Sequence, residues 1–532
     1  MSSNDNAAIQ KPQSIIVSKI YKCIDIVQNY FVEIALFFFF LSRHMSLPLF
    51  QEYVESQIYS QHGVPFPGFG DLKENTSLSD PAWDQAHHES VLVVLGLQIA
   101  EGLPAIVSVI ILGAVSDKTG RHKILLWLPA LGSCLHSLIY IMILYTQWNI
   151  DGLFLAAALR GLSGSMTAFL AGSSFYAINY VKPENRLNRL AVQEFLIGGA
   201  YAVGNVMVGF WVKDAGFRKP FLFTLICGMI SLLISFFLVQ ETVSGQANQA
   251  SPAVRRQRPS NCCSDTFGPL LKYLKCFGNS TLAKIWLAIL VFQAYAFVHI
   301  GQINTLVLYL SQQKYLFAME NPITGGGPWA KIGLFLAVIM AVAALATGVC
   351  VPIFQKFLSD TKIVFLGFAS KALGTLWIAV IHNETILYFA ILLLAFELFP
   401  FPILRAKVAR NVSPSEQGTV FAMMHCGESI TYFLAPFMFS VIYASTMSFY
   451  SGFVFIVSML FLTIPVILLL VLLFVEARCP NGYQPMEGLS DPMGAAGDQA
   501  EAQSQTMLTG DPISFIHLSN GSNDETGNAE QL

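Results

Sequence analysis

The feature that most constrains this chain is a series of long apolar runs without charged side chains. Residues 453–475, for example, contain no Asp, Glu, Lys or Arg, and this run exceeds the roughly 20 apolar residues that a helix needs to cross a bilayer. The 532-residue chain is 54% hydrophobic and 12% charged, which is about half the charge of ordinary soluble domains. The composition therefore excludes a soluble protein and predicts an integral membrane protein in a lipid bilayer. A net charge of −3 gives no sign of a nucleic-acid partner.

Windows of about 19 residues predict twelve membrane-spanning helices and an all-α fold. The first apolar segment is of full membrane length, so it is interpreted as a signal anchor and not as a cleaved signal peptide. The predicted spans lie at residues 30–50, 90–115, 123–146, 152–179, 191–212, 220–240, 285–310, 331–355, 363–382, 385–405, 418–441 and 449–476.

The distribution of Lys and Arg between these spans predicts the sidedness. With the first segment in the cytoplasm, the inner segments hold 21 of the 30 basic residues and the outer loops hold six, which is the bias that membrane insertion favours. Both ends are then cytoplasmic, and a central loop separates two six-helix halves. The expected divisions are a cytoplasmic segment at 1–29, a first half at 30–241 with an outer loop at 51–89, a central loop at 242–284, a second half at 285–478, and a disordered tail at 479–532.

Short motifs outside the spans predict modification and sorting. Asn75 and Asn383 begin sequons in predicted outer loops and are candidate glycosylation sites. Tyr483 and Met486 form a Tyr-x-x-apolar pattern of the kind that directs endocytosis or lysosomal delivery. None of the nine cysteines falls in a predicted outer loop, so no extracellular disulfide is expected. The plasma membrane is the expected location, an endosomal or lysosomal membrane is the alternative, and the expected assembly is a monomer or weak homo-oligomer.

A charged loop between the second and third spans carries a specific motif. Residues 113–123 read Gly-Ala-Val-Ser-Asp-Lys-Thr-Gly-Arg-His-Lys; the glycines permit a tight turn, and the basic residues can pair with Asp117 or with a neighbouring helix end. A merely basic inner loop is the alternative interpretation. The pattern resembles the signature loop of the major facilitator superfamily, which implies a loop that locks the two halves together on the inner side. Residues 359–362, in the equivalent loop of the second half, match this pattern only weakly. The residues assigned to this gating loop are Gly113, Asp117, Lys118, Gly120, Arg121 and Lys123.

Ionisable side chains inside the spans are further candidates, because each costs about 2.5–3.5 kcal/mol at the bilayer centre. The superfamily resemblance implies that spans one, four, seven and ten line a central cavity, flanked by spans two, five, eight and eleven. Lys371, on span nine, is interpreted as a structural partner of Glu397. These ionisable residues include Arg43, His44, Glu101, Arg160, Glu194, His299, Lys371, Glu397, Arg405, His425 and Glu428.

Three of these residues are candidates for proton handling on chemical grounds. Glu194 lies among apolar residues that would desolvate its carboxyl group. His425 and Glu428 are three residues apart and share one helix face, where either proton exchange or satisfied packing would suit them. The proton is the expected coupling ion, and neither a metal nor an organic cofactor is expected.

Other motifs resemble solute carrier family 46, the proton-coupled folate transporter family. The motifs are residues 402–407, 416–421, 298–301 with Tyr309, and 442–446 with 452–453. This resemblance covers about residues 30–476. It implies that Glu194 takes part in proton coupling, together with His299, and that Arg405 binds the anionic substrate.

Four positions depart from the folate carrier's pattern. Ser165 and Asn304 stand where that carrier has aspartates, and Glu397 and Glu428 stand where it has small or amide side chains, although a lysosomal member of the family also has a glutamate at the latter position. The cysteine pair of its outer loops is also missing. The resemblance thus implies proton coupling, whereas folate specificity does not follow from it.

Together these residues predict a secondary carrier that moves a small organic anion with a proton by alternating access. Folates, cyclic dinucleotides and conjugated anions are the substrate classes that the resemblance implies. An enzyme is not expected, because there is no P-loop and no His-Glu-x-x-His motif, and residues 161–165 only partly match a nucleophile elbow and suit helix packing better. A carrier-shaped accessory or receptor protein without transport is the alternative. The substrate-binding candidates are Arg43, Arg160, Arg405, Glu397, Ser165 and Asn304.

Overall fold

The computed structural model describes nine stretches of the chain, and all of their regular elements are helices. These stretches are residues 6–64, 81–146, 151–179, 181, 183–241, 280–312, 328–413, 416–446 and 449–478. The first half contains α1 (Asn6–Gln61), α2 (Pro81–Thr119), α3 (Ile124–Thr146), α4 (Gly152–Leu162), α5 (Ser165–Asn179), η1 (Pro183–Asn185), α6 (Arg186–Ala215), α7 (Arg218–Leu233) and η2 (Ile234–Leu238). The second half contains α10 (Ser280–Gln312), α11 (Pro328–Phe354), α12 (Asp360–Val380), α13 (Glu384–Leu387), α14 (Ala390–Leu393), α15 (Pro400–Arg410), α16 (Gln417–Thr446) and α17 (Phe453–Arg478).

Eleven helical segments within these stretches are long and apolar enough to cross a membrane, and they coincide with eleven of the twelve predicted spans. The tenth predicted span, 385–405, is not one continuous helix but the three short helices α13, α14 and α15. Between α14 and α15 the backbone amides bond three residues back, as Glu397 does to the carbonyl of Leu394 and Phe399 to that of Phe396. Pro400 has no N–H to continue an α-helical ladder, so the regular helix restarts there.

Several element ends differ from the prediction. Helix α1 begins at Asn6 and runs to Gln61, and α2 begins at Pro81, so the predicted outer loop at 51–89 is shorter than expected. Helix α10 begins at Ser280, inside the predicted central loop. The sequon at Asn75 and the sorting pattern at Tyr483 and Met486 lie outside the described residues.

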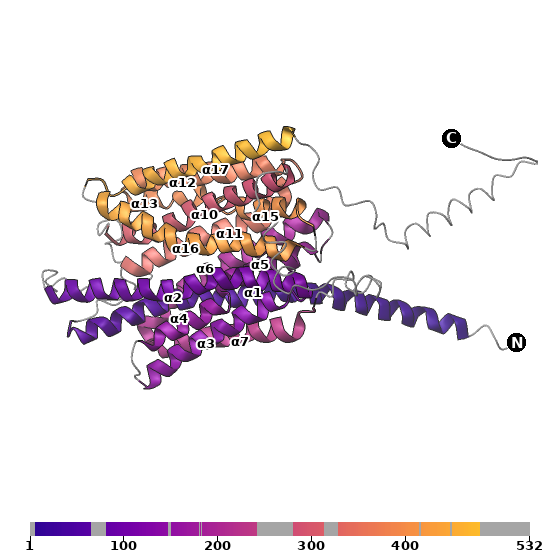
Figure 1. Cartoon of the computed structure of the whole chain (residues 1–532), viewed down its shortest axis with the longest axis horizontal. Helices are drawn as coiled ribbons and strands as arrows, with labels where there is room; N and C mark the ends of the chain where they lie inside the picture. Colours follow the sequence, from indigo (N-terminus) through magenta and orange to yellow (C-terminus); the bar gives the residue numbers. More distant parts are fainter. Residues whose placement is uncertain are drawn as a thin grey trace, which may run out of the picture. The chain divides into compact units, whose positions relative to one another are not determined.

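The helices gather in two groups that follow the two halves of the sequence (Figure 1). Helices α1 to α7 pack around one apolar core, and α12, α15 and α17 pack with α10 around another. The halves meet where α6 packs along α11 and where α2 packs along α16. Alanines and leucines of α5 and α6, including Ala177 and Leu190, also belong to the core of the second half. Since these positions lie toward the predicted inner ends of α5 and α6, the halves share an apolar contact on that side.

The fourth predicted span is divided between α4 and α5 by a sharp local turn. Gly164 and Ser165 both have positive φ angles, of 91° and 48°, a conformation that is costly for serine. The adjacent Gly161 lies directly against the backbone of Glu101 on α2, where any added Cβ would overlap the Glu101 carbonyl. The predicted packing role of residues 161–165 is therefore confirmed, and the turn brings Ser165 to Glu101.

Candidate functional site

A cavity of about 290 Å³ lies between the two halves, close to the lower limit of ordinary small-molecule sites. Its wall is mostly apolar and rich in aromatic rings. The rings belong to Phe40, Phe50, Tyr140, Tyr201, Phe401, Tyr432 and Phe433. The predicted site residues that line it are Arg43, Ser165, Glu194, His299, Asn304, Arg405 and Glu428.

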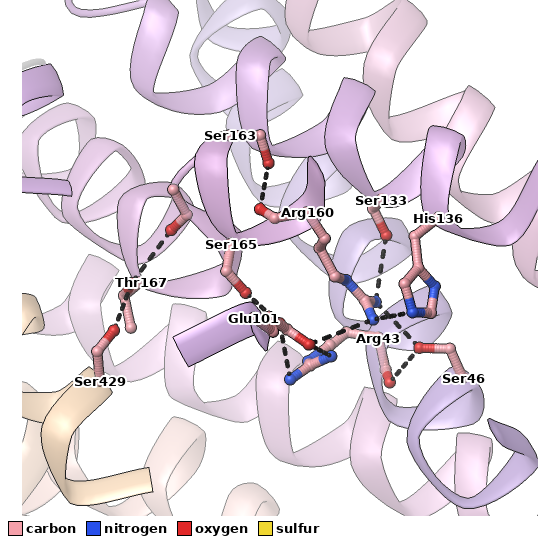
Figure 2. Close-up of polar contacts among 11 residues, drawn as sticks. Arg43, Ser46, Glu101, Ser133, His136, Arg160, Ser163, Ser165, Thr167 and Ser429 are labelled. Carbon is pink, nitrogen blue, oxygen red and sulfur yellow. Dashed lines mark hydrogen bonds and ion pairs between the residues drawn. The ribbon is translucent and has the colours of Figure 1, made fainter. Parts of the chain in front are cut away.

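The first charged group at the wall is the α1–α2 cluster, which we define as Arg43 on α1, Glu101 on α2 and, behind them, Arg160 on α4 (Figure 2). The Arg43 guanidinium pairs with both carboxylate oxygens of Glu101, at 3.1 and 3.2 Å. Arg160 lies 3.9 Å from the same carboxylate, and the Ser165 hydroxyl donates to it at 2.5 Å. Two cations thus share one anion.

Arg160 lies behind this cavity wall and does not line the cavity. Its guanidinium donates to the Ser46 hydroxyl at 3.0 Å and lies 3.4 Å from Nε2 of His136 (Figure 2). The side chain is only 2% exposed. Arg160 therefore does not reach the cavity in this conformation, because Ser46, His136 and Glu101 enclose its guanidinium, and its role in attracting the substrate stays a prediction.

The second charged group, the α6–α15 cluster, consists of Glu194, Arg405 and Glu428. Glu194 on α6 forms an ion pair with Arg405 on α15, so this bond joins the two halves. The Arg405 guanidinium also lies 5.5 Å from the centre of the Phe292 ring, a cation–π distance. Glu428 lines the same cavity from α16, which gives this cluster two carboxylates for one guanidinium.

His425 supports Glu428 from behind. Its Nδ1 lies 2.6 Å from a carboxylate oxygen of Glu428, which places the two side chains on one helix face as predicted. His425 is fully buried and does not line the cavity. Proton exchange between His425 and the cavity would therefore have to pass through Glu428.

Glu397 lies one layer behind the cavity, where it pairs with Lys371 at 2.7 Å. Nδ1 of His299 is 3.6 Å from the same oxygen of Glu397, and His299 itself reaches the cavity wall. The predicted structural pair of Lys371 and Glu397 is confirmed. Glu397 does not reach the cavity in this conformation, because its side chain is 1% exposed and held by Lys371, and its role in substrate binding stays a prediction.

Ser165 and Asn304 take different positions around the cavity. Ser165 is held by Glu101, whereas Asn304 on α10 donates to the carbonyl of Ile300 in its own helix and remains exposed to the cavity. Asn383, the described candidate glycosylation site, is exposed after α12, and its side-chain oxygen accepts from the amide of Ile386 at the start of α13.

On the predicted inner side, Asp117 at the end of α2 caps the first turn of α16. Its carboxylate accepts from the amides of Gly418 and Thr419, at 3.1 and 2.6 Å, and from the Thr419 hydroxyl at 2.6 Å. A carboxylate at a helix amino terminus is stabilised by the helix dipole. Gly113 lies one helical turn earlier and packs so closely on Ala422 that a Cβ there would overlap it.

The other residues of the gating loop lie around this contact. Gly120 has a φ of +67°, which forms the tight turn after α2. The Lys123 amide donates to Glu241 at 3.3 Å, and its ammonium lies over the Phe236 ring, while Lys118 and Arg121 are exposed. His122 is stacked on Phe175, and burial lowers its pKa to about 4, so it is neutral near Asp117.

The positions of these contacts decide which side of the cavity is closed. Contacts between the halves cluster at the predicted inner helix ends, where Asn179 also donates to Gln417 at 2.8 Å. The lining residues lie instead in the middle and outer turns, such as Gln51 near the outer end of α1 and Pro436 on α16. The structure is therefore closed at the helix ends predicted to be inner, with its cavity displaced toward the ends predicted to be outer.

Sequence reasoning missed a buried ion pair between Glu33 and Arg189. Nε of Arg189 lies 2.5 Å from a carboxylate oxygen of Glu33, and both side chains are buried. Arg189 is one of the 21 basic residues counted in the predicted inner segments. Glu33 lies inside the first predicted span, and an acidic residue there was a usable signal for a basic partner.

Comparison with known proteins identifies the family. A family model described as Major Facilitator Superfamily matches residues 33–396. A chicken (Gallus gallus) protein, the lysosomal proton-coupled steroid conjugate and bile acid symporter SLC46A3, is 25% identical over 443 residues, which cover 82% of this chain and 92% of that protein. The proton-coupled folate transporter of the rat (Rattus norvegicus) is 28% identical over 362 residues, or 68% of this chain and 74% of the relative.

Solved structures show the same fold. The crystal structure of the human organic anion transporter MFSD10 (TETRAN) superposes with a TM-score of 0.59 at 15% identity, over 84% of this chain and 99% of that chain. The resemblance to solute carrier family 46 is confirmed by the two relatives, both of them transporters and not enzymes. The chain therefore belongs to the major facilitator superfamily and is a multi-pass membrane transporter.

Proposed function

We propose that this transporter carries a small organic anion together with a proton by alternating access. The observation that carries this proposal is the Glu194–Arg405 ion pair, which joins the two halves inside the cavity. A carboxylate in this place can bind a proton from the cavity, and protonation removes its attraction for the guanidinium. One proton would thus weaken a bond between the halves.

The cycle follows from this pair. On the outer side, the cavity admits the anion and a proton, and the protonated Glu194 releases Arg405. The halves then rearrange, Asp117 leaves the first turn of α16, and the inner side opens. Loss of the proton to the cytoplasm lets the ion pair re-form. The names of two relatives support this class of substrate, since one is a proton-coupled symporter of steroid conjugates and bile acids and the other is a proton-coupled folate transporter.

Uptake driven by a pH gradient tests the role of Glu194. In cells with measured surface expression, Glu194→Gln should abolish the stimulation of uptake by an acidic outer medium, because glutamine cannot exchange a proton. The probe is a mixture of labelled folate, methotrexate, a cyclic dinucleotide and a steroid sulfate. Glu476→Gln is the matched control, since Glu476 pairs with Lys407 at the inner end of α17 and is partly exposed. The proposal would be contradicted if the Glu194→Gln variant, at normal surface expression, still showed uptake driven by the pH gradient.

We also propose the plasma membrane as the site of action, with the protein as a monomer or weak homo-oligomer. An acidic outer medium there supplies the inward proton gradient. A fluorescent tag on the full chain should mark the cell surface; a signal confined to lysosomes would contradict this location.

A further inference from the structure

The two charged clusters of the cavity carry opposite net charges. The α1–α2 cluster contains two guanidinium groups and one carboxylate, a net charge of +1. The α6–α15 cluster contains one guanidinium group and two carboxylates, a formal charge of −1 when His425, which pairs with Glu428, is counted as uncharged. Counted over these two clusters, with the lining histidines His44, His136 and His299 taken as uncharged, the empty cavity has no net charge but has a positive and a negative end.

Arg43 is the cation best placed to receive a ligand. Among the described side chains that line the cavity, Arg43 and Arg405 carry guanidinium groups. Arg405 is 3% exposed and engaged by Glu194, whereas Arg43 is 14% exposed. Glu101, the ion-pair partner of Arg43, also lies 3.9 Å from Arg160 (Figure 2). Arg160 can therefore remain paired with the Glu101 carboxylate when Arg43 turns toward a ligand.

We propose that the α1–α2 cluster is the anion subsite, and that Arg43 exchanges Glu101 for a single acid group of the substrate. This inference rests on the proposed function and adds where the substrate's acid group binds and how many such groups the substrate carries. Arg160 and the Ser165 hydroxyl hold Glu101 during the exchange. One acid group brings this cluster from +1 to zero, and one proton brings the α6–α15 cluster from −1 to zero.

This charge balance provides a rule for coupling. A cavity that is empty, or that holds one proton and one monoanion, has no net charge. A cavity that holds only the proton or only the anion has a net charge of one, and carrying an unbalanced charge through a dry, closed state is unfavourable. Only the empty and the doubly occupied carrier would then change conformation readily, as one-to-one symport requires.

The wall of the cavity indicates the rest of the substrate. The rings of Phe40, Tyr140, Tyr201 and Tyr432 form a large apolar surface, which suits a bulky apolar body. The expected substrate class is thus an amphipathic monoanion, with a single sulfate, sulfonate or carboxylate at the Arg43 end. A second acid group would leave the loaded cavity with a net charge of −1, because one proton already brings the α6–α15 cluster to zero.

Uptake of a steroid monosulfate and of the matching steroid disulfate into proteoliposomes tests this subsite. The wild type should prefer the monosulfate, and Arg43→Gln should lose uptake of both. Glu101→Gln raises the cluster to +2 and should increase the ratio of disulfate to monosulfate uptake about tenfold. Arg218→Gln, at an exposed position on the outer end of α7, is the control and should leave the ratio unchanged.

A charge relocation separates this role from a structural one. Because the Ser165 hydroxyl lies 2.5 Å from the Glu101 carboxylate, Ser165→Asp adds a second carboxylate to the cluster and should depress uptake of both sulfates. The double variant Ser165→Asp with Glu101→Gln restores the +1 charge and should recover the preference for the monosulfate. An unchanged ratio in Glu101→Gln, or no recovery in a folded double variant, would overturn the subsite. If the wild type itself takes up no anion under a proton gradient, the proposed function fails instead.

Discussion

The Asp117 contact with α16 offers a direct test of how the inner side is closed. Asp117→Asn keeps the size of the side chain but removes its charge and turns one hydrogen-bond acceptor into a donor. That donor would face the amide and hydroxyl of Thr419, which both donate to Asp117 at 2.6 Å. The inner-closed state should therefore be selectively destabilised.

The magnitude follows from the contacts. A hydrogen bond to a charged group contributes about 1.5–3 kcal/mol, and a charge at a partly buried helix end contributes up to about 2 kcal/mol. Because asparagine can still accept from the Gly418 amide, we expect a net loss of about 3 kcal/mol. This corresponds to a shift of roughly 100-fold toward the inward-open state.

The assay is labelling of Asn304→Cys by a membrane-impermeant thiol reagent from the outer side, since Asn304 is exposed to the cavity. The Asp117→Asn variant should be labelled more slowly than its parent. Asp360→Asn is the control at the equivalent place in the second half, where Asp360 pairs with the exposed Arg410 and the pair is worth at most about 1 kcal/mol. Equal labelling rates in the Asn304→Cys protein with and without Asp117→Asn would show that the contact of Asp117 with α16 does not hold the inner side closed.

Three further outcomes follow from other contacts. Gly113→Val should block closure of the inner side, because the new side chain would overlap Ala422; outward labelling and uptake should both fall. Lys371→Ala should lower the free energy of unfolding by about 3–5 kcal/mol, measured as a drop in Tm, because it leaves Glu397 buried without its cation; a Tm equal to that of wild type would contradict this. His122 has a folded-state pKa of about 4, below its unfolded value of 6.5, so the unfolded state binds more protons below pH 6.5. Stability should fall by about 1.4 kcal/mol per pH unit as the pH drops from 6.5 toward 4, and His122→Gln should flatten that part of the Tm profile.

Hydropathy and charge distribution predict most of this fold because they are properties of single segments. Eleven of the twelve spans form as predicted, whereas the tenth is divided at residues 388–389 and 394–399, before Pro400 begins α15. The helix ends at Gln61 and Pro81 were missed because helices extend past the apolar stretch that hydropathy detects.

The candidate site was predicted less completely, because its pairings depend on which helices meet. The charges in the spans indicate a functional cavity, yet nothing in the sequence says that Arg160 lies behind Glu101 or that Glu397 is taken by Lys371. The Glu33–Arg189 pair was missed for the same reason, since its members are 156 residues apart. Spacing along one helix predicts only local pairs, such as His425 with Glu428.

Proton movement driven by substrate is the most direct test of coupled anion transport. Purified protein in sealed proteoliposomes, with equal pH inside and outside and a pH-sensitive dye in the lumen, should acidify the lumen when a steroid monosulfate is added outside. The rate should match that of sulfate uptake at one proton per anion, and Glu194→Gln should abolish the proton signal. Uptake of the sulfate without acidification of the lumen by the wild type would contradict the account.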